Sequence, residues 1–175
     1  MLFRSSSSAP GGAAIERLVA ALWDLGLEPG HSVRTIADCE REAEADITVE
    51  TALLESRWLA GSRTLMRQFE AAVKKRLDAR SFFQAKRVEM QQRHARHQDT
   101  PYALEPNCKE SPGGLRDLQV ILWMARAAGF GDNWRQVARA GLLTASEARD
   151  LRRAEQAFKR LRIELHLLAN RREDR

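Results

Sequence analysis

The stretch YALEPNCKESPGGLRDLQ, residues 102–119, lies between two long patterns of charged and apolar residues that predict helices. It is not typical of an ordinary helix–helix connection, because it concentrates charges, amides and a pair of glycines. Pro112 fixes φ for the start of a turn, and Gly113 and Gly114 permit positive φ just before a helix predicted from Leu115. The stretch therefore predicts a defined turn whose charges need a physical reason.

Two interpretations of the charges in this stretch are open. Backbone N–H groups at the helix start, with Lys109 and Arg116 beside them, could bind an anionic group such as a substrate phosphate. Alternatively, the stretch is a structural loop in which Lys109 and Arg116 pair with Glu105, Glu110 or Asp117. The residues alone do not decide between an anion site and an ion-paired loop.

Helical patterns fill most of the chain on both sides of this stretch. Ser62 and the Thr144–Glu147 capping box mark two helix starts, and Gly26 and Gly61 mark two ends. The last helix repeats apolar residues at spacings of three and four, which predicts a partner helix. The predicted helices are 14–25, 38–44, 51–60, 62–77, 81–97, 115–128 and 144–168, with a short one capped by Asp132.

Strand patterns are confined to the N-terminal part. Residues 27–36 predict a short strand around Val33, and ADITVE, residues 45–50, alternates with Ile47 and Val49 on one face. Two strands are too few to stand alone. The fold class is therefore α+β and mostly helical.

Composition narrows the class of protein. With 175 residues, 43% hydrophobic and 30% charged, the chain fits one soluble domain or one domain plus part of a second. No apolar run reaches the roughly 20 residues that cross a bilayer, and no signal peptide is recognised, so a cytoplasmic location is expected. The net charge of +5 is compatible with nucleic-acid binding, but basic residues alternate with acidic ones at helical spacing, which argues against that partner. Cys39 and Cys108 are interpreted as reduced thiols.

Three candidate site residues lie outside the turn. Asp46 could hold a divalent metal for phosphoryl transfer, although one carboxylate is not a site and a water-facing Asp is favoured by the residues alone. Arg34 could contact a triphosphate if its strand lines a cleft; a surface strand end is the alternative. His94, three residues before His97, has metal-ligand spacing, but the surrounding arginines favour a solvated face.

Four segments resemble one known family: LWDLGLEPGHSVRT (22–35), ADITVETALLESRWLAG (45–61), RHARHQDTPYALEPNCKESPGGLRDLQ (93–119) and RIELHLLANRREDR (162–175). They look like the bifunctional uridylyltransferase/uridylyl-removing enzymes that modify the PII nitrogen-regulatory protein in bacteria. The resemblance extends from Ile15 to the last residue.

The resemblance implies a nucleotidyltransferase fold of the DNA-polymerase-β type, whose small mixed sheet carries a Gly-Ser loop, a D-x-D pair and a later third acid. Asp46 matches that third acid, as a catalytic residue and metal ligand. The family transfers UMP from UTP to a tyrosine of PII with Mg²⁺, and a separate metal-dependent domain removes it. The stretch 102–119 then belongs to the joint with a following helical domain.

The chain departs from the family pattern at its start, since the Gly-Ser loop and the D-x-D pair are missing, and Met1–Phe3 resembles the tail of the strand that carries them. We therefore expect an internal fragment that is inactive alone. Its expected parts are a flexible segment (1–13), the C-terminal part of the nucleotidyltransferase domain (14–100) and the truncated start of the helical domain (101–175). The alternatives are a non-catalytic helical module that binds PII or another partner, and a basic nucleic-acid-binding domain.

Overall fold

The computed structural model describes residues 2–3, 12–27 and 30–175. They fall into two compact units, Met1–Leu77 and Asp78–Arg175. The sequence places a domain boundary later, at residue 100, and the assignment of these domains stays a prediction. Of the segment expected to be flexible, residues 2–3 form a strand and residues 12–13 begin a helix. The rest of that segment lies outside the described residues.

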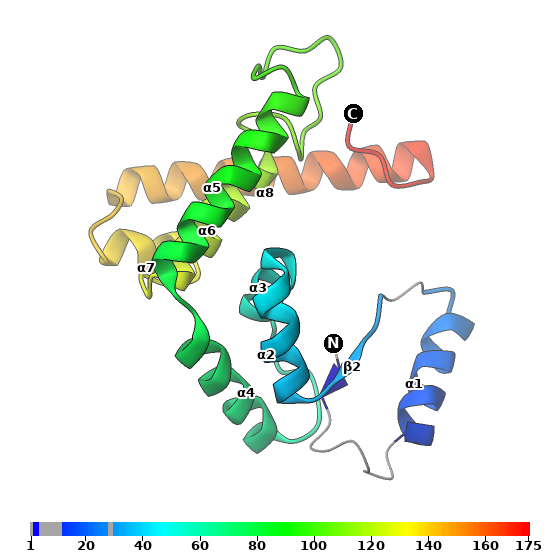
Figure 1. Cartoon of the computed structure of the whole chain (residues 1–175). Helices are drawn as coiled ribbons and strands as arrows, with labels where there is room; N and C mark the ends of the chain where they lie inside the picture. The colour runs from blue at the N-terminus through cyan, green and yellow to red at the C-terminus, as the bar shows by residue number, and fades with distance from the viewer. Residues whose placement is uncertain (1, 4–11, 28–29) are drawn as a thin grey trace. The chain divides into compact units, whose positions relative to one another are not determined.

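The first unit is built mainly from helices (Figure 1). Its elements are β1 (Leu2–Phe3), α1 (Gly12–Asp24), β2 (Val33–Arg34), α2 (Ile36–Ala45), α3 (Ile47–Leu54) and α4 (Arg63–Arg76). β1 and β2 pair in parallel, with Leu2 opposite Val33 and Phe3 opposite Arg34. This pair is the whole sheet among the described residues. The strand around Val33 is thus confirmed, whereas the polymerase-β-type sheet stays a prediction.

Helix α2 starts at a capping box. The Thr35 hydroxyl accepts a hydrogen bond from Asp38 N, and the Asp38 carboxylate accepts one from Thr35 N. Cys39 and Ala43 lie one turn apart on the same face of α2, and this face is buried against α3 and α4. Cys39 and Cys108 are both buried, and no disulfide joins them, in agreement with reduced thiols.

The strand predicted over Ala45–Glu50 is wrong, because these residues bridge two helices. Asp46 ends α2 and caps α3, and its carboxylate accepts a hydrogen bond from Thr48 N at 2.7 Å. The β-branched residues here favour a strand locally. However, the Asp46 carboxylate caps a helix start, and Val49 and Leu53 lie one helical turn apart in the core of the unit. Tertiary packing therefore overrides the local preference.

Helix α3 also ends earlier than predicted, at Leu54 rather than at residue 60. The connection to α4 is irregular, and in it Trp58 Nε1 donates to Gly61 O at 3.2 Å. Ser62 caps α4 as predicted, accepting from Leu65 N at 3.2 Å. Phe69 of α4 is 1% exposed and fills the core of the unit together with Cys39, Ala43, Leu53 and Met66.

The second unit holds four helices, α5 (Ala79–Arg96), α6 (Leu115–Ala127), α7 (Trp134–Arg139) and α8 (Ala145–Ala169). Helices α5 and α6 pack against each other. Phe83 and Val88 of α5 are about half exposed. The buried face of α5 carries Phe82, Lys86 and Arg93 instead. Lys86 is accommodated because its ammonium contacts Glu89 at 2.7 Å and lies 4.8 Å from the Trp123 ring centre.

Helix α8 packs against α6 and α7, so the predicted partner helices are confirmed for its first half. The Thr144–Glu147 capping box forms as predicted. Helix α7 is capped by Asn133 and not by Asp132, since the Asn133 side chain accepts from Gln136 N. Trp134 is buried, and its Nε1 donates to Glu155 Oε2 of α8 at 2.8 Å.

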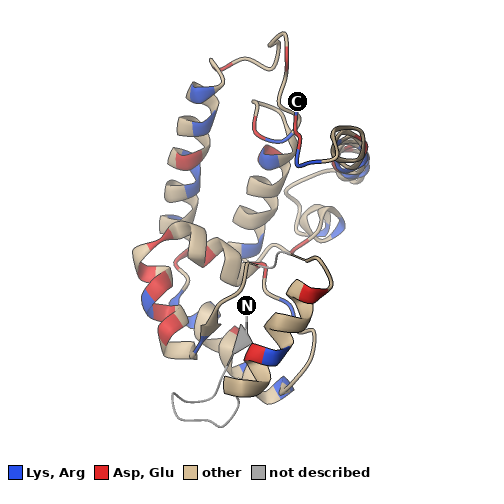
Figure 2. Cartoon of the chain, turned by 90° about the vertical axis from the view of Figure 1, so that its right-hand side faces the viewer, with Lys and Arg blue, Asp and Glu red and all other residues tan. Residues whose placement is uncertain are grey.

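Charged residues of both signs are spread over the helices (Figure 2). Within residues 12–27 and 30–175, no helix is long and apolar enough to cross a lipid bilayer.

The first unit should depend on Phe69. Because this ring is almost fully buried, Phe69→Ala is expected to lower the free energy of unfolding by roughly 3–5 kcal/mol. Leu59→Ala is the control in the same unit, since Leu59 is 74% exposed, and it should change the value by less than about 1 kcal/mol. Urea denaturation measures both. Equal effects of the two variants would contradict the described core.

Candidate functional site

Arg34 and Asp46 lie in the first unit, close to the two ends of α2. Arg34 Nη2 is 3.9 Å from Glu42 Oε2, a loose ion pair with a half-buried guanidinium. The nearby Asp38 carboxylate stays ionised, because hydrogen bonds from Thr35 and the hydrogen bond and charge of Arg41 keep the pKa of Asp38 well below its usual range. Arg34, at the end of β2, is thus only weakly paired with Glu42.

Asp46 is exposed and lies between two helices. Its N–H donates to Glu42 O at 3.1 Å and its carboxylate accepts from Thr48 N, so it closes one helix and opens the next. Among the described residues, no group of three or more His, Cys, Asp and Glu side chains is positioned to hold a metal ion. The geometry accounts for Asp46 as a helix cap, and its catalytic and metal-binding roles stay predictions.

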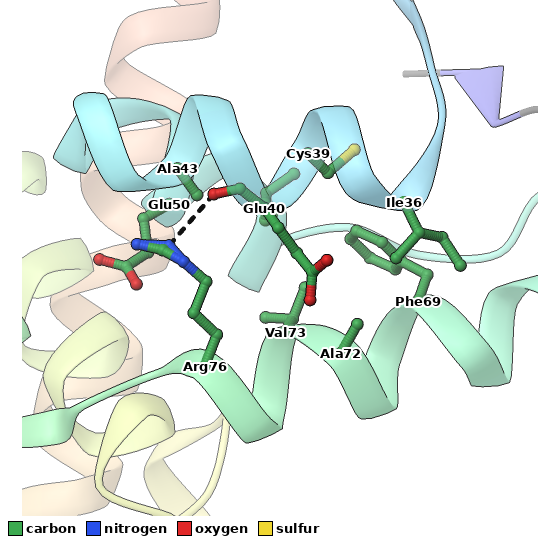
Figure 3. Close-up of a pocket in the computed structure, with 10 residues that line it drawn as sticks. Ile36, Cys39, Glu40, Ala43, Glu50, Phe69, Ala72, Val73 and Arg76 are labelled. Carbon is green, nitrogen blue, oxygen red and sulfur yellow. Dashed lines mark hydrogen bonds between the residues drawn. The ribbon is translucent and has the colours of Figure 1, made fainter. Parts of the chain in front are cut away.

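A small cavity lies between α2, α3 and α4 (Figure 3). Its volume is about 10 Å³, which corresponds to one water molecule. Arg76 closes one end, where its Nη1 donates to Glu40 O at 3.3 Å. Cys39 lines the cavity, and burial raises the pKa of its thiol. This cavity is a packing feature of the core and is too small for a nucleotide.

The stretch 102–119 belongs to the second unit, and its folded part begins at Asn107. The Asn107 Oδ1 atom accepts hydrogen bonds from Lys109 N at 3.0 Å and Glu110 N at 2.7 Å. Ser111 Oγ accepts from Asn107 N at 3.0 Å, and Ser111 N donates back to Asn107 O at 3.1 Å. The turn is therefore closed by its own side chains.

The paired glycines serve different purposes. Gly113 has φ +78°, a left-handed conformation that most residues avoid. A Cβ atom on Gly114 would lie 2.9 Å from the carbonyl oxygens of Lys109 and Ser111, so this position requires close backbone approach. Only glycine satisfies the second requirement.

The N–H groups at the start of α6 already have acceptors within the chain. Leu115 N donates to Cys108 O at 3.0 Å, and Arg116 N donates to Lys109 O at 2.9 Å. Gly113 N donates to Asp117 Oδ2 at 2.7 Å. The backbone donors that an anion would use are thus occupied by the folded turn.

The cations of the turn pair with one carboxylate. Lys109 Nζ and Arg116 Nη2 each lie 3.2 Å from Glu110 Oε1. Burial alone would raise the pKa of Glu110, but the charge and hydrogen bond of Arg116, with Lys109 beside it, lower this pKa below its usual value. Ion pairing with Glu110 is confirmed, and the substrate-binding roles of Lys109 and Arg116 stay predictions.

Asp117 connects the turn to α5. Its carboxylate accepts a short hydrogen bond from Arg93 Nη2, lies 2.9 Å from His94 Nε2 and accepts from Gly113 N. Arg93 and Asp117 are both largely buried, at 8% and 17% side-chain exposure. The solvent-facing role predicted for His94 is therefore wrong, because its ring turns inward to this carboxylate. No sequence pattern indicated this cluster, since its members come from different helices.

Asp174 holds the end of the described chain on the turn. Its carbonyl oxygen accepts from Cys108 N at 2.8 Å, and its carboxylate accepts from Arg162 Nε at 2.5 Å. Burial alone would raise the pKa of Asp174, but the hydrogen bond and charge of Arg162 and the charge of Lys109 lower it. The contact is long-range in sequence, so sequence spacing gave no sign of it.

The two glycines of the turn should respond differently to substitution. Gly114→Ala is expected to lower the free energy of unfolding of the second unit by roughly 1–3 kcal/mol, because the new methyl group meets backbone oxygens that cannot move independently. Gly113→Asn should cost less than about 1 kcal/mol, since Asn tolerates the left-handed conformation. Chemical denaturation measures the free energy of unfolding of both variants. A Gly114→Ala variant as stable as the wild type would contradict the close backbone approach.

The Asp174 contact should make stability depend on pH in a defined direction. The folded pKa of Asp174 lies below its ordinary value of 3.8, so the stabilisation is present above that value and is lost as pH falls through the folded pKa. The melting temperature of the wild type should exceed that of Asp174→Asn at about pH 5, and the margin should shrink below about pH 4. Thermal melts measure it.

Asp150→Asn is the control for this pH series, because Asp150 is exposed and lies 3.6 Å from Arg153. Its margin should be small throughout. A margin for Asp174→Asn that grows as the pH falls below about 4 would contradict the assigned pairing.

Comparisons with known proteins agree on one family. The sequence profile described as GlnD PII-uridylyltransferase matches residues 81–175. The bifunctional uridylyltransferase/uridylyl-removing enzymes of Bordetella parapertussis and Bordetella avium are each 81% identical over all 175 residues, and that of Cupriavidus pinatubonensis is 56% identical over 174. The chain spans about 20% of the length of each of these relatives. No solved structure matches the chain. The chain belongs to the GlnD PII-uridylyltransferase family.

Proposed function

We propose that the chain is a segment of a uridylyltransferase that moves UMP from UTP to a tyrosine of the PII nitrogen-regulatory protein in the cytoplasm. The observation that carries the proposal is the family match over residues 81–175, together with relatives that align with the whole chain. The polymerase-β-type sheet belongs to the same proposal, with β1 and β2 as its described part.

In this proposal Asp46 supplies one ligand to Mg²⁺. A carboxylate oxygen is the ligand type that Mg²⁺ prefers, and Asp46 is exposed at a helix junction. When bound, the metal neutralises negative charge on the transferred phosphate. Asp46 fits as one ligand and not as a complete site, so the remaining acids would come from elsewhere in the family protein. The chain alone is then expected to be inactive.

The three basic candidates would act on substrate charge. Arg34 is held by Glu42 only at 3.9 Å, so a triphosphate would compete for its guanidinium with little loss. Lys109 and Arg116 share Glu110, and an incoming anion would have to displace that carboxylate. We therefore favour Arg34 as the contact to UTP, with Lys109 and Arg116 as second candidates.

Asp46 offers a test that separates metal binding from helix capping. Asn is as good a helix cap as Asp but carries no charge. In a full-length family protein that contains this sequence, Asp46→Asn and Asp46→Ala should both reduce label transfer from UTP to PII by roughly 10²-fold or more. Only Asp46→Ala should lower the melting temperature, in line with a lost cap of about 1 kcal/mol.

Asp78→Asn is the matched control, because Asp78 caps α5 and accepts from Ser81 N at 2.9 Å. It should leave both transfer and stability close to the wild type. If Asp46→Asn transfers UMP at the wild-type rate, Asp46 is a helix cap and the metal role is abandoned.

A further inference from the structure

A groove between α7 and α8 is lined by four arginines. Arg135 and Arg139 come from α7, and Arg149 and Arg152 come from α8, around a hollow of about 440 Å³. All four side chains are exposed, and no Asp or Glu is among the lining residues. The groove therefore presents positive charge from both helices that form it.

These arginines differ from Arg153 and Lys159 of α8, which both have carboxylate partners. Arg153 lies 3.6 Å from Asp150, and Lys159 lies 2.5 Å from Glu155. Across the described residues, no ion pair or side-chain hydrogen bond engages any of the four groove arginines. Like charges gathered without counter-charges repel one another, and a bound anion relieves that repulsion. The groove is thus electrostatically prepared for an anionic ligand.

The floor of the groove is apolar and small. Ala138, Ala145 and Ala148 leave the space open, and Trp134 closes the bottom at 3% exposure. The Trp134 Nε1 atom is already bonded to Glu155, and its ring is covered. The floor therefore offers neither an aromatic face for stacking nor a free polar group for reading a base.

The lining chemistry selects among anions. Single-stranded nucleic acids depend on stacking against exposed aromatic rings, which this floor lacks. Guanidinium groups match carboxylates with paired hydrogen bonds, and the alanines accept a small apolar side chain. We propose that the groove docks an acidic segment of a partner protein, with carboxylates on both sides of a small apolar residue.

Charge complementarity supports an acidic partner on this unit. Residues 78–175 contain nineteen Lys and Arg against thirteen Asp and Glu, whereas residues 1–77 contain ten against eleven. The second unit therefore accounts for the positive balance of the chain and would steer an acidic segment toward itself. The docking role uses none of the residues assigned to UMP transfer and is independent of that proposal.

Fluorescence polarisation with the 175-residue chain tests the groove. The probe is a fluorescein-labelled peptide of alternating glutamate and alanine. The double variant Arg139→Ser/Arg149→Ser should weaken its binding at least about tenfold. The matched control is Arg153→Ser/Arg160→Ser, which removes the same charge from α8 outside the groove and should change affinity by less than about twofold.

A second variant tests the shape of the groove without altering charge. Ala145→Leu fills part of the floor at an exposed helix position, so it should weaken peptide binding several-fold while circular dichroism and the melting temperature stay unchanged. Unchanged affinity for this variant would overturn the proposal. Equal loss in the two arginine doubles would also overturn it, because the attraction would then be general.

Competing ligands give the remaining outcomes. The same peptide with glutamine in place of glutamate should not bind, and inorganic phosphate should compete only through ionic strength. If a single-stranded oligonucleotide binds more tightly than the acidic peptide with the same dependence on Arg139 and Arg149, the groove serves nucleic acid and the proposal is wrong. Absence of measurable peptide binding would overturn it as well.

Discussion

The carboxylate of Asp117 is the contact on which the second unit depends. It receives Arg93 and His94 from α5 and the N–H of Gly113 from the turn, at the first turn of α6. These donors compensate the buried charge of the carboxylate. Removing Asp117 would leave the largely buried Arg93 guanidinium without its counter-charge. Asp117 thereby fixes the end of α5 against the start of α6.

The turn that contains Asp117 resolves the unusual composition of residues 102–119. The Asn107 side chain accepts hydrogen bonds from the backbone of the turn. Gly113 adopts a left-handed conformation, and Gly114 allows close backbone approach. The two cations of the turn pair with Glu110. Asp174 joins the same network through Arg162 and Cys108. Phosphate binding is thus not needed to explain the charges and amides of the turn. Partners within the chain are shown for Asn107, Lys109, Glu110, Ser111, Arg116 and Asp117.

Sequence patterns predicted the elements whose signals are local. The Thr144–Glu147 capping box and the Ser62 cap formed as expected, because a cap depends on residues within one turn. The predicted strand over residues 45–50 was wrong because Asp46 caps a helix there, and α3 packs against α2 in the core of the first unit. Of the candidate site residues, the pairing of Lys109 and Arg116 with Glu110 was foreseeable. The inward turn of His94 was not, since it depends on a contact between helices.

The assignment of residues 102–119 as a self-satisfied structural turn is tested most directly by amide hydrogen exchange at Leu115 and Arg116. Their N–H groups donate to Cys108 O and Lys109 O, so we predict protection comparable to the middle of α6, unchanged on addition of phosphate. Exchange at the rate of an open chain, with protection gained only when phosphate is added, would contradict this account and establish an anion site.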